Sequence, residues 1–138
     1  MRPKTMFWMV IAGAIVLLTP ITLMYAAPLS SWVKHPTPVL SYGSPGTWDN
    51  GSVESADVFF DATATHAYRM WYTGYGNLDE RPRIGYATSA DGLTWAKHPQ
   101  PVVSFGSGFD WNGAGSSAPA VLRDDCEADP ARRWKMWF

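Results

Sequence analysis

The sequence predicts an all-β protein built from two copies of one four-stranded unit. Two observations of composition and one of order carry this prediction. Aromatic residues make up 14% of the 138 residues, and Gly and Pro are frequent, at 12 and 11. This composition is typical of short strands joined by tight turns. The observation of order is an internal duplication, which implies that one group of strands packs against another.

The duplication begins with residues 32–43, which recur as residues 95–106 with eight of twelve positions identical. Three shorter matches follow in the same order, at offsets between 61 and 66 residues: 48–49 with 109–110, 55–58 with 117–120, and 68–72 with 134–138. Insertions in loops would produce such a variation in offset. We therefore expect a first unit over about 32–95 and a second over about 95–138.

Four strands are expected in the first unit, near residues 53–60, 67–73 and 83–89 and from residue 95 onward. In the second of these, apolar side chains alternate onto both sides of the strand: Tyr68, Met70 and Tyr72 on one, Trp71 on the other. A strand that is apolar on both faces must be covered above and below. Four-stranded units stacked in this way are the blades of a β-propeller.

Residues 28–138 are accordingly expected to form about one and a half blades of an incomplete propeller. The second unit reaches residue 138 inside its second strand, so the sequence is interpreted as the N-terminal fragment of a longer protein. The alternative, a small complete domain, would leave a wide aromatic face exposed.

Residues 1–27 have the pattern of an export segment. Arg2 and Lys4 precede the stretch 6–24, which is apolar apart from Thr19, Pro20 and Thr22. This predicts a hydrophobic helix that is either a cleaved signal peptide or a retained membrane anchor. Both alternatives place the rest of the chain outside the cytoplasm, secreted or membrane-anchored.

The charge balance and the single cysteine limit the possible partners and bonds. A net charge of −1 gives no reason to expect nucleic acid as a partner, and nothing indicates an oligomer. Cys126 has no second cysteine to pair with inside the chain. The many aromatic rings fit two interpretations: a bulky β-sheet core, or platforms on which sugar rings stack.

Four motifs resemble the blade repeats of five-bladed β-propeller glycoside hydrolases, families 32, 43, 68 and 130. They are Met-Trp-Tyr-Thr-Gly at 70–74, Ile-Gly-Tyr-Ala-Thr-Ser at 84–89, Asp-Gly-Leu-Thr-Trp at 91–95 and Pro-Val-Leu at 38–40. The resemblance covers about residues 32–138. It implies a protein that hydrolyses glycosidic bonds in oligo- or polysaccharides, with carboxylates from different blades meeting at a central channel.

Residues 89–95 also resemble the Asp-box turn of sialidase propellers, Ser-x-Asp-x-Gly-x-Thr-Trp. Here the residue between Asp91 and Gly92 is missing, which favours the five-bladed group. In both groups the turn is structural, so Asp91 is assigned no chemistry.

The resemblance points to Asp57 as the catalytic base, in the context Ala56-Asp57-Val58. The proline that usually follows this Asp is absent, and the repeat alignment puts Pro119 at the equivalent position. The alternative role for Asp57 is a strand-end carboxylate that accepts a hydrogen bond from a nearby backbone N–H. Glu54 is the rival carboxylate, and in a regular strand it would lie on the opposite side from Asp57.

Trp48, Asp49 and Glu54 are the candidate substrate-binding residues. Trp48 could line a sugar subsite, whereas Asp49 aligns with Asp110 in the second unit, which equally fits a turn cap common to both units. The general acid of these enzymes, a Glu in a later blade, has no counterpart here. The 138-residue chain alone is therefore expected to be inactive.

No metal or cofactor is expected. The acidic stretch 124–129 lacks the glycine and the ligand spacing of a calcium loop and is interpreted as a solvated hairpin tip. His35 and His98 occupy equivalent positions before proline, and His66 is isolated, so no zinc pattern is present. Two alternatives to an enzyme remain: a non-catalytic carbohydrate-binding propeller at the cell surface, and a purely structural surface protein.

Overall fold

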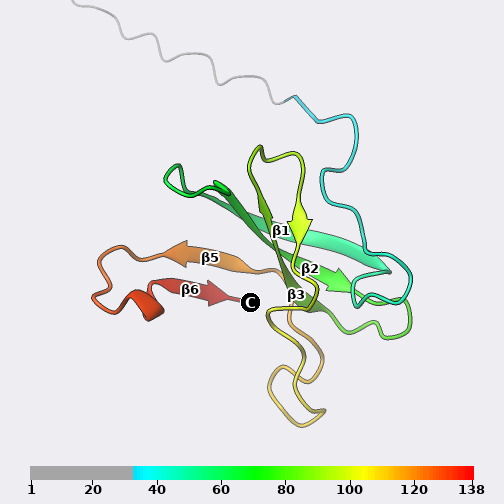
Figure 1. Ribbon diagram of the computed structural model, residues 1–138. Helices are drawn as coiled ribbons and strands as arrows, with labels where there is room; N and C mark the ends of the chain where they lie inside the picture. Colours follow the sequence, from blue (N-terminus) through cyan, green and yellow to red (C-terminus); the bar gives the residue numbers. More distant parts are fainter. Residues whose placement is uncertain (1–32) are drawn as a thin grey trace, which may run out of the picture. The chain divides into compact units, whose positions relative to one another are not determined.

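The computed structural model describes residues 33–138, and over this range the protein consists of two antiparallel sheets (Figure 1). The first sheet has the order β1 (Ser52–Phe60), β2 (Tyr68–Tyr75), β3 (Arg83–Ser89) and β4 (Ala96–Lys97). The second pairs β5 (Ala120–Arg123) with β6 (Trp134–Trp137), which a 3₁₀ turn, η1 (Pro130–Arg132), precedes. The predicted all-β class is confirmed for these residues. The predicted N-terminal helix and export segment lie outside them.

The first three strands form where the alternation of apolar residues predicts them, and the fourth is only two residues long. Among residues 33–138 the structure has no helix with the length and apolar character needed to cross a membrane.

One face of the first sheet carries the core. Met70 and Tyr72 of β2 and Ala87 of β3 are buried there. Because side chains alternate along a strand, these residues share one face. Partly buried apolar residues from the strand β1, the preceding loop and the following turn pack against them: Leu40, Trp48, Val53 and Trp95. This face is thus covered largely by the chain that leads into the sheet.

The second unit covers the opposite face through Trp134 at the start of β6. The Trp134 ring lies 5.0 Å from Phe59, edge to face, and 5.5 Å from Trp71. Two cations flank it, with the Arg69 and Arg123 guanidinium groups 5.1 and 5.9 Å from the ring centre. The expectation that β2 is covered on both faces is therefore confirmed.

The strand β1 contains a bulge that the sequence pattern does not indicate. Glu54 pairs with Thr73 and Asp57 pairs with Trp71, so three steps along β1 match two steps along β2. Ser55, inside the bulge, has a φ of 47°, which is the left-handed region that residues other than Gly rarely adopt. The extra residue shifts the alternation of side chains, so residues of β1 on either side of the bulge no longer follow the simple odd–even pattern of faces.

The two units repeat the same hairpin register. Val58 pairs with Met70 in the first unit, and Val121 pairs with Met136 in the second. Asp57 pairs with Trp71, and Ala120 pairs with Trp137. The residue structurally equivalent to Asp57 is thus Ala120, and the sequence alignment with Pro119 was wrong by one position.

The turn from β3 to β4 is organised by the Asp91 carboxylate. It accepts hydrogen bonds from the backbone N–H groups of Thr94 (2.7 Å) and Leu93 (2.8 Å) and from the Ser89 hydroxyl (2.9 Å). These bonds hold the pKa of Asp91 well below its ordinary value. Gly92 supplies the positive φ, 74°, that the turn requires. Every bond to Asp91 is local, which agrees with the structural role expected for this turn.

The lowered pKa of Asp91 predicts a specific pH dependence of stability. The folded-state pKa lies below the unfolded value of about 3.9, so ionised Asp91 stabilises the fold above that pH. This stabilisation is lost as the pH falls through the folded-state pKa. We expect Asp91→Ala to lower the free energy of unfolding near neutral pH and to differ less from wild type below about pH 4. Urea unfolding followed by tryptophan fluorescence measures the difference.

Glu80→Ala is the matched control, since Glu80 is also an exposed acid of a loop. It should leave the free energy of unfolding nearly unchanged at every pH. A wild-type advantage over Asp91→Ala that stays constant down to acid pH would contradict this account of the turn.

Candidate functional site

The bulge in β1 places the two candidate carboxylates on the same face of the sheet. Their partners in β2, Thr73 and Trp71, are two residues apart and therefore point to one side. Glu54 and Asp57 follow them, because directly paired residues of an antiparallel ladder share a face. The expectation of opposite sides rested on a regular strand and was wrong. The sequence does not indicate the bulge, because it forms at a serine rather than at a glycine.

Asp57 is half-buried and turned toward the second unit. Its Oδ2 accepts a hydrogen bond from the backbone N–H of Val121 at 2.6 Å. Thr73, which pairs with Glu54, makes a similar contact: its buried hydroxyl accepts a hydrogen bond from the Ala118 N–H at 2.9 Å. Asp57 therefore helps to hold β5 beside β1, and one of its oxygens is committed to that contact.

Glu54 is exposed and is held by one side chain. The Tyr75 hydroxyl, at the end of β2, donates to Glu54 Oε1 at 2.9 Å. This bond is the main reason that the pKa of Tyr75 is raised, with smaller contributions from desolvation and the Glu54 charge. Tyr75 was not among the sequence candidates. Tyr75 lies two residues after Thr73 and four after Trp71, so all three side chains share one face of β2. This spacing in the sequence could have indicated that Tyr75 lies on the same face as Glu54.

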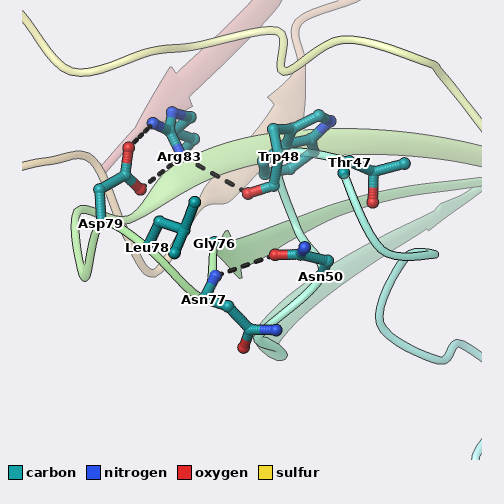
Figure 2. Close-up of a pocket in the computed structure, with 9 residues that line it drawn as sticks. Thr47, Trp48, Asn50, Gly76, Asn77, Leu78, Asp79 and Arg83 are labelled. Atoms are coloured by element: carbon teal, nitrogen blue, oxygen red, sulfur yellow. Dashed lines mark hydrogen bonds and ion pairs between the residues drawn. The ribbon is translucent and has the colours of Figure 1, made fainter.

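Trp48 lines a shallow hollow between two loops (Figure 2). The hollow encloses about 150 Å³. The Arg83 guanidinium donates to the Asp79 carboxylate, and it reaches the backbone oxygen of Trp48 at 3.4 Å. The Asn77 N–H donates to Asn50 Oδ1 at 2.9 Å, so the two loops are joined at both ends of the hollow. The volume is below the roughly 300 Å³ at which ligand pockets usually begin.

The Trp48 ring is fixed by its packing on β2. It stacks on Tyr72 at 5.9 Å with an angle of 22° between the rings. A Cβ atom at Gly74 would lie 2.6 Å from the Trp48 ring, so the glycine is needed for this close approach. Trp48 thus belongs to the core on one side and borders the hollow on the other.

Asp49 is buried, with 3% of its surface exposed, beneath this loop. Its Oδ2 pairs with Lys97 Nζ at 2.6 Å and accepts from the Tyr72 hydroxyl at 3.1 Å, while Oδ1 accepts from Thr47. Burial and the neighbouring carboxylate raise the pKa of the Tyr72 phenol strongly. The Asp49 carboxylate is therefore occupied by a structural network, and a sugar bound in the hollow would not meet it directly.

The sequence alignment of Asp49 with Asp110 is also corrected by the structure. The Gly43 N–H donates to the Asp49 carbonyl, and the Gly106 N–H donates to the Asn112 carbonyl. The structural counterpart of Asp49 is thus Asn112, and the counterpart of Trp48 one residue earlier is Trp111. A common turn cap at Asp49 and Asp110 does not exist.

In the acidic stretch that joins β5 to β6, Asp124, Asp125 and Glu127 pair with nearby cations. Asp124 binds Lys135 of β6, and this hydrogen bond, followed by the Cys126 N–H, lowers the pKa of Asp124. Over residues 33–138 no group of three or more His, Cys, Asp or Glu side chains could hold a metal ion. His35 and His98 each contact a carbonyl oxygen two residues ahead, at 2.7 and 2.8 Å.

No protein-family model, curated protein or solved structure matches this chain.

The buried network at Asp49 gives a prediction for stability. Asp49→Ala leaves the Lys97 ammonium and the Tyr72 hydroxyl without their shared acceptor, and we expect the free energy of unfolding to fall by about 2–3 kcal/mol. Tyr72→Phe removes only one neutral donor and should cost about 1 kcal/mol. Urea unfolding measures both. Equal losses in the two variants would show that the Asp49–Lys97 pair contributes little.

The contact of Tyr75 with Glu54 can be tested directly in solution. Glu54→Gln removes the negative acceptor, so the raised pKa of Tyr75 should fall toward the ordinary value of about 10. Titration of the Tyr75 ring signals by NMR measures the change. Glu80→Gln, which removes an equal charge from a different loop, should leave the pKa of Tyr75 in place. An unchanged pKa in Glu54→Gln would mean that the hydroxyl does not bind Glu54 in solution.

Proposed function

We propose that this chain is part of a glycoside-hydrolase-like protein and supplies one side of its carbohydrate site. In this proposal Asp57 is the catalytic base, and Glu54, held by Tyr75, is a carboxylate that contacts the sugar. Five-bladed propeller architecture, with these two sheets as its first and second blades, is part of the same proposal.

The observation that carries the proposal is the bulge in β1. It places Glu54 and Asp57 on one face, beside the point where β1 meets β5. Carboxylates that converge on a bond are the usual machinery of glycoside hydrolysis. Both carboxylates belong to one short segment, however, whereas cleavage requires groups on two sides of the bond. The general acid therefore has to come from outside this segment, as the resemblance implies.

A second candidate function, carbohydrate binding without hydrolysis, is supported by Asp57 itself. One of its oxygens already accepts the Val121 N–H, which fits a carboxylate that joins two sheets. The hollow beside Trp48, with Asn50 and Asn77 at its rim, would then be the main sugar contact. Localisation outside the cytoplasm, by secretion or by an N-terminal anchor, fits both functions and is proposed with them.

Both candidates are tested with the 138-residue chain and a panel of arabino-, xylo-, fructo- and manno-oligosaccharides. Calorimetry measures binding, and a reducing-sugar assay measures hydrolysis. We expect saturable binding of at least one oligosaccharide without hydrolysis. Glu54→Gln should weaken that binding by roughly tenfold, because a charge-assisted hydrogen bond to a sugar hydroxyl is lost.

Asn50→Ala distinguishes the site at β1 from the hollow. If it alone weakens binding while Glu54→Gln has no effect, the hollow is the binding site and the non-catalytic function is favoured. Binding of no oligosaccharide in the panel would overturn both candidates. Release of reducing sugar by the 138-residue chain would overturn the assignment of the general acid to another part of the protein.

A further inference from the structure

The loop that leads into β1 carries a modification motif that the proposed function does not use. Residues 50–52 read Asn-Gly-Ser, which is the pattern Asn-x-Ser/Thr at which asparagine side chains are N-glycosylated. The chain has two other asparagines. Asn77 is followed by Leu-Asp and Asn112 by Gly-Ala, so neither has a hydroxyl residue two positions later. Asn112 thus offers a matched comparison, because a glycine also follows it.

The two polar atoms of the Asn50 amide are in different situations. Oδ1 accepts a hydrogen bond from the Asn77 N–H at 2.9 Å, whereas Nδ2 makes no hydrogen bond with any residue in the range 33–138. Nδ2 is the atom to which a glycan is joined. Asn112 differs here too, because its Nδ2 donates to the Ser104 carbonyl at 3.2 Å. The folded loop therefore leaves the acceptor nitrogen of Asn50 available.

The hollow beside Trp48 provides room for a first sugar joined to this nitrogen. Asn50 lines the hollow together with Trp48 and Leu78 (Figure 2). The Leu78 side chain is fully exposed. A pyranose attached to Asn50 Nδ2 would lie beside these two apolar side chains, whose surfaces suit the C–H face of a sugar ring.

We propose that Asn50 is an N-glycosylation site and that the first sugar of its glycan covers the hollow. The hollow is then filled by the chain's own sugar, and the carboxylates of β1 remain open to a substrate. Because N-glycosylation takes place outside the cytoplasm, this proposal rests on the export of the chain that is proposed together with its function.

The donor is an oligosaccharide joined to a polyprenyl diphosphate, and a membrane-bound transferase catalyses the step. Asn50 Nδ2 forms a bond to the anomeric carbon of the sugar, and the bond from that carbon to the diphosphate oxygen breaks. The diphosphate leaves with the electron pair of that bond, and the amide nitrogen loses one proton.

Glycan transfer has to precede closure of the β1–β2 hairpin. In the folded chain the Gly51 N–H donates to the Tyr75 carbonyl at 2.8 Å, and Ser52 pairs with Tyr75. These contacts hold residues 50–52 against β2, whereas a transferase that engages the Asn50 and Ser52 side chains together needs this backbone free. Modification therefore occurs on the emerging chain, and the fold accommodates the glycan afterwards.

Cell-free translation of the 138-residue chain with endoplasmic-reticulum microsomes tests the site. We expect a product enlarged by one glycan, which peptide-N-glycosidase F returns to the unmodified size. Asn50→Gln and Ser52→Ala should each abolish the enlarged product, whereas Ser52→Thr should keep it. Asn112→Gln is the matched control and should change nothing. An enlarged product that persists in Asn50→Gln would overturn the assignment.

A second chain separates the site from the export segment. Residues 1–27 are replaced by a cleavable signal peptide, and an acceptor tag added after Phe138 reports translocation. Glycosylation of the tag without Asn50 would overturn the proposal. Glycosylation of Asn50 only in this second chain would uphold the site and overturn the proposed export by residues 1–27. Neither result depends on sugar binding or hydrolysis by the protein.

Hydroxyl-radical footprinting of the glycosylated chain locates the sugar. Oxidation of Leu78 should be several-fold lower than in the enzymatically deglycosylated chain. Leu93, which is 54% exposed in the turn from β3 to β4, is the control and should be oxidised equally in both. Equal oxidation of Leu78 in the two chains would show that the glycan leaves the hollow open, and would overturn the placement of the sugar.

Discussion

The placement of Trp134 against the first sheet is the interaction on which the rest of the described structure depends. Phe59 and Trp71 present an apolar surface on the face opposite the core, and such a surface needs cover. Each aromatic pair contributes roughly 0.5–1.5 kcal/mol beyond the area it buries. An ion pair from Arg123 to Asp61, at 3.0 Å, fixes the same contact at its edge. With β6 held there, β5 lies beside β1, and only then does Asp57 reach the Val121 N–H.

Much of the secondary structure could be predicted because it is encoded locally. Alternating apolar residues and the Asp91-Gly92 turn define three strands and one hairpin, and the structure has them within two residues of the predicted limits. The bulge in β1 could not be predicted in this way. It sits at Ser55, a residue with no preference for a positive φ, between two residues of β1 that pair with β2.

The candidate site was predictable by residue but not by geometry. Glu54 and Asp57 were identified from the chain, whereas their common face follows from the bulge. The burial of Asp49 depends on Lys97, 48 residues later, and no local pattern reveals such a partner. The alignment of Asp49 with Asp110 failed for a related reason: glycine-rich loops allow several similar alignments, and only the bonds of Gly43 and Gly106 distinguish them.

The repeat offers a way to separate residues that the fold requires from residues that serve another purpose. The backbone is copied, including positive φ at Ser55 and at its counterpart Ala118, yet Glu54 and Asp57 become Ser117 and Ala120. The hairpin therefore forms without carboxylates at these positions, although Asp57 of the first unit also binds the Val121 N–H of the second.

Absence from the second unit is not sufficient by itself, since Asp49 also fails to recur and is plainly structural. Exposure and partners make the distinction. Asp49 has a cation and a phenol bound to it in the core, whereas Glu54 is exposed and, among residues 33–138, is bound by Tyr75 alone. Glu54 is thus a surface carboxylate that the hairpin does not need, held in one orientation by Tyr75 on the same face as Asp57, and the proposed contact with a sugar rests on this difference from Asp49.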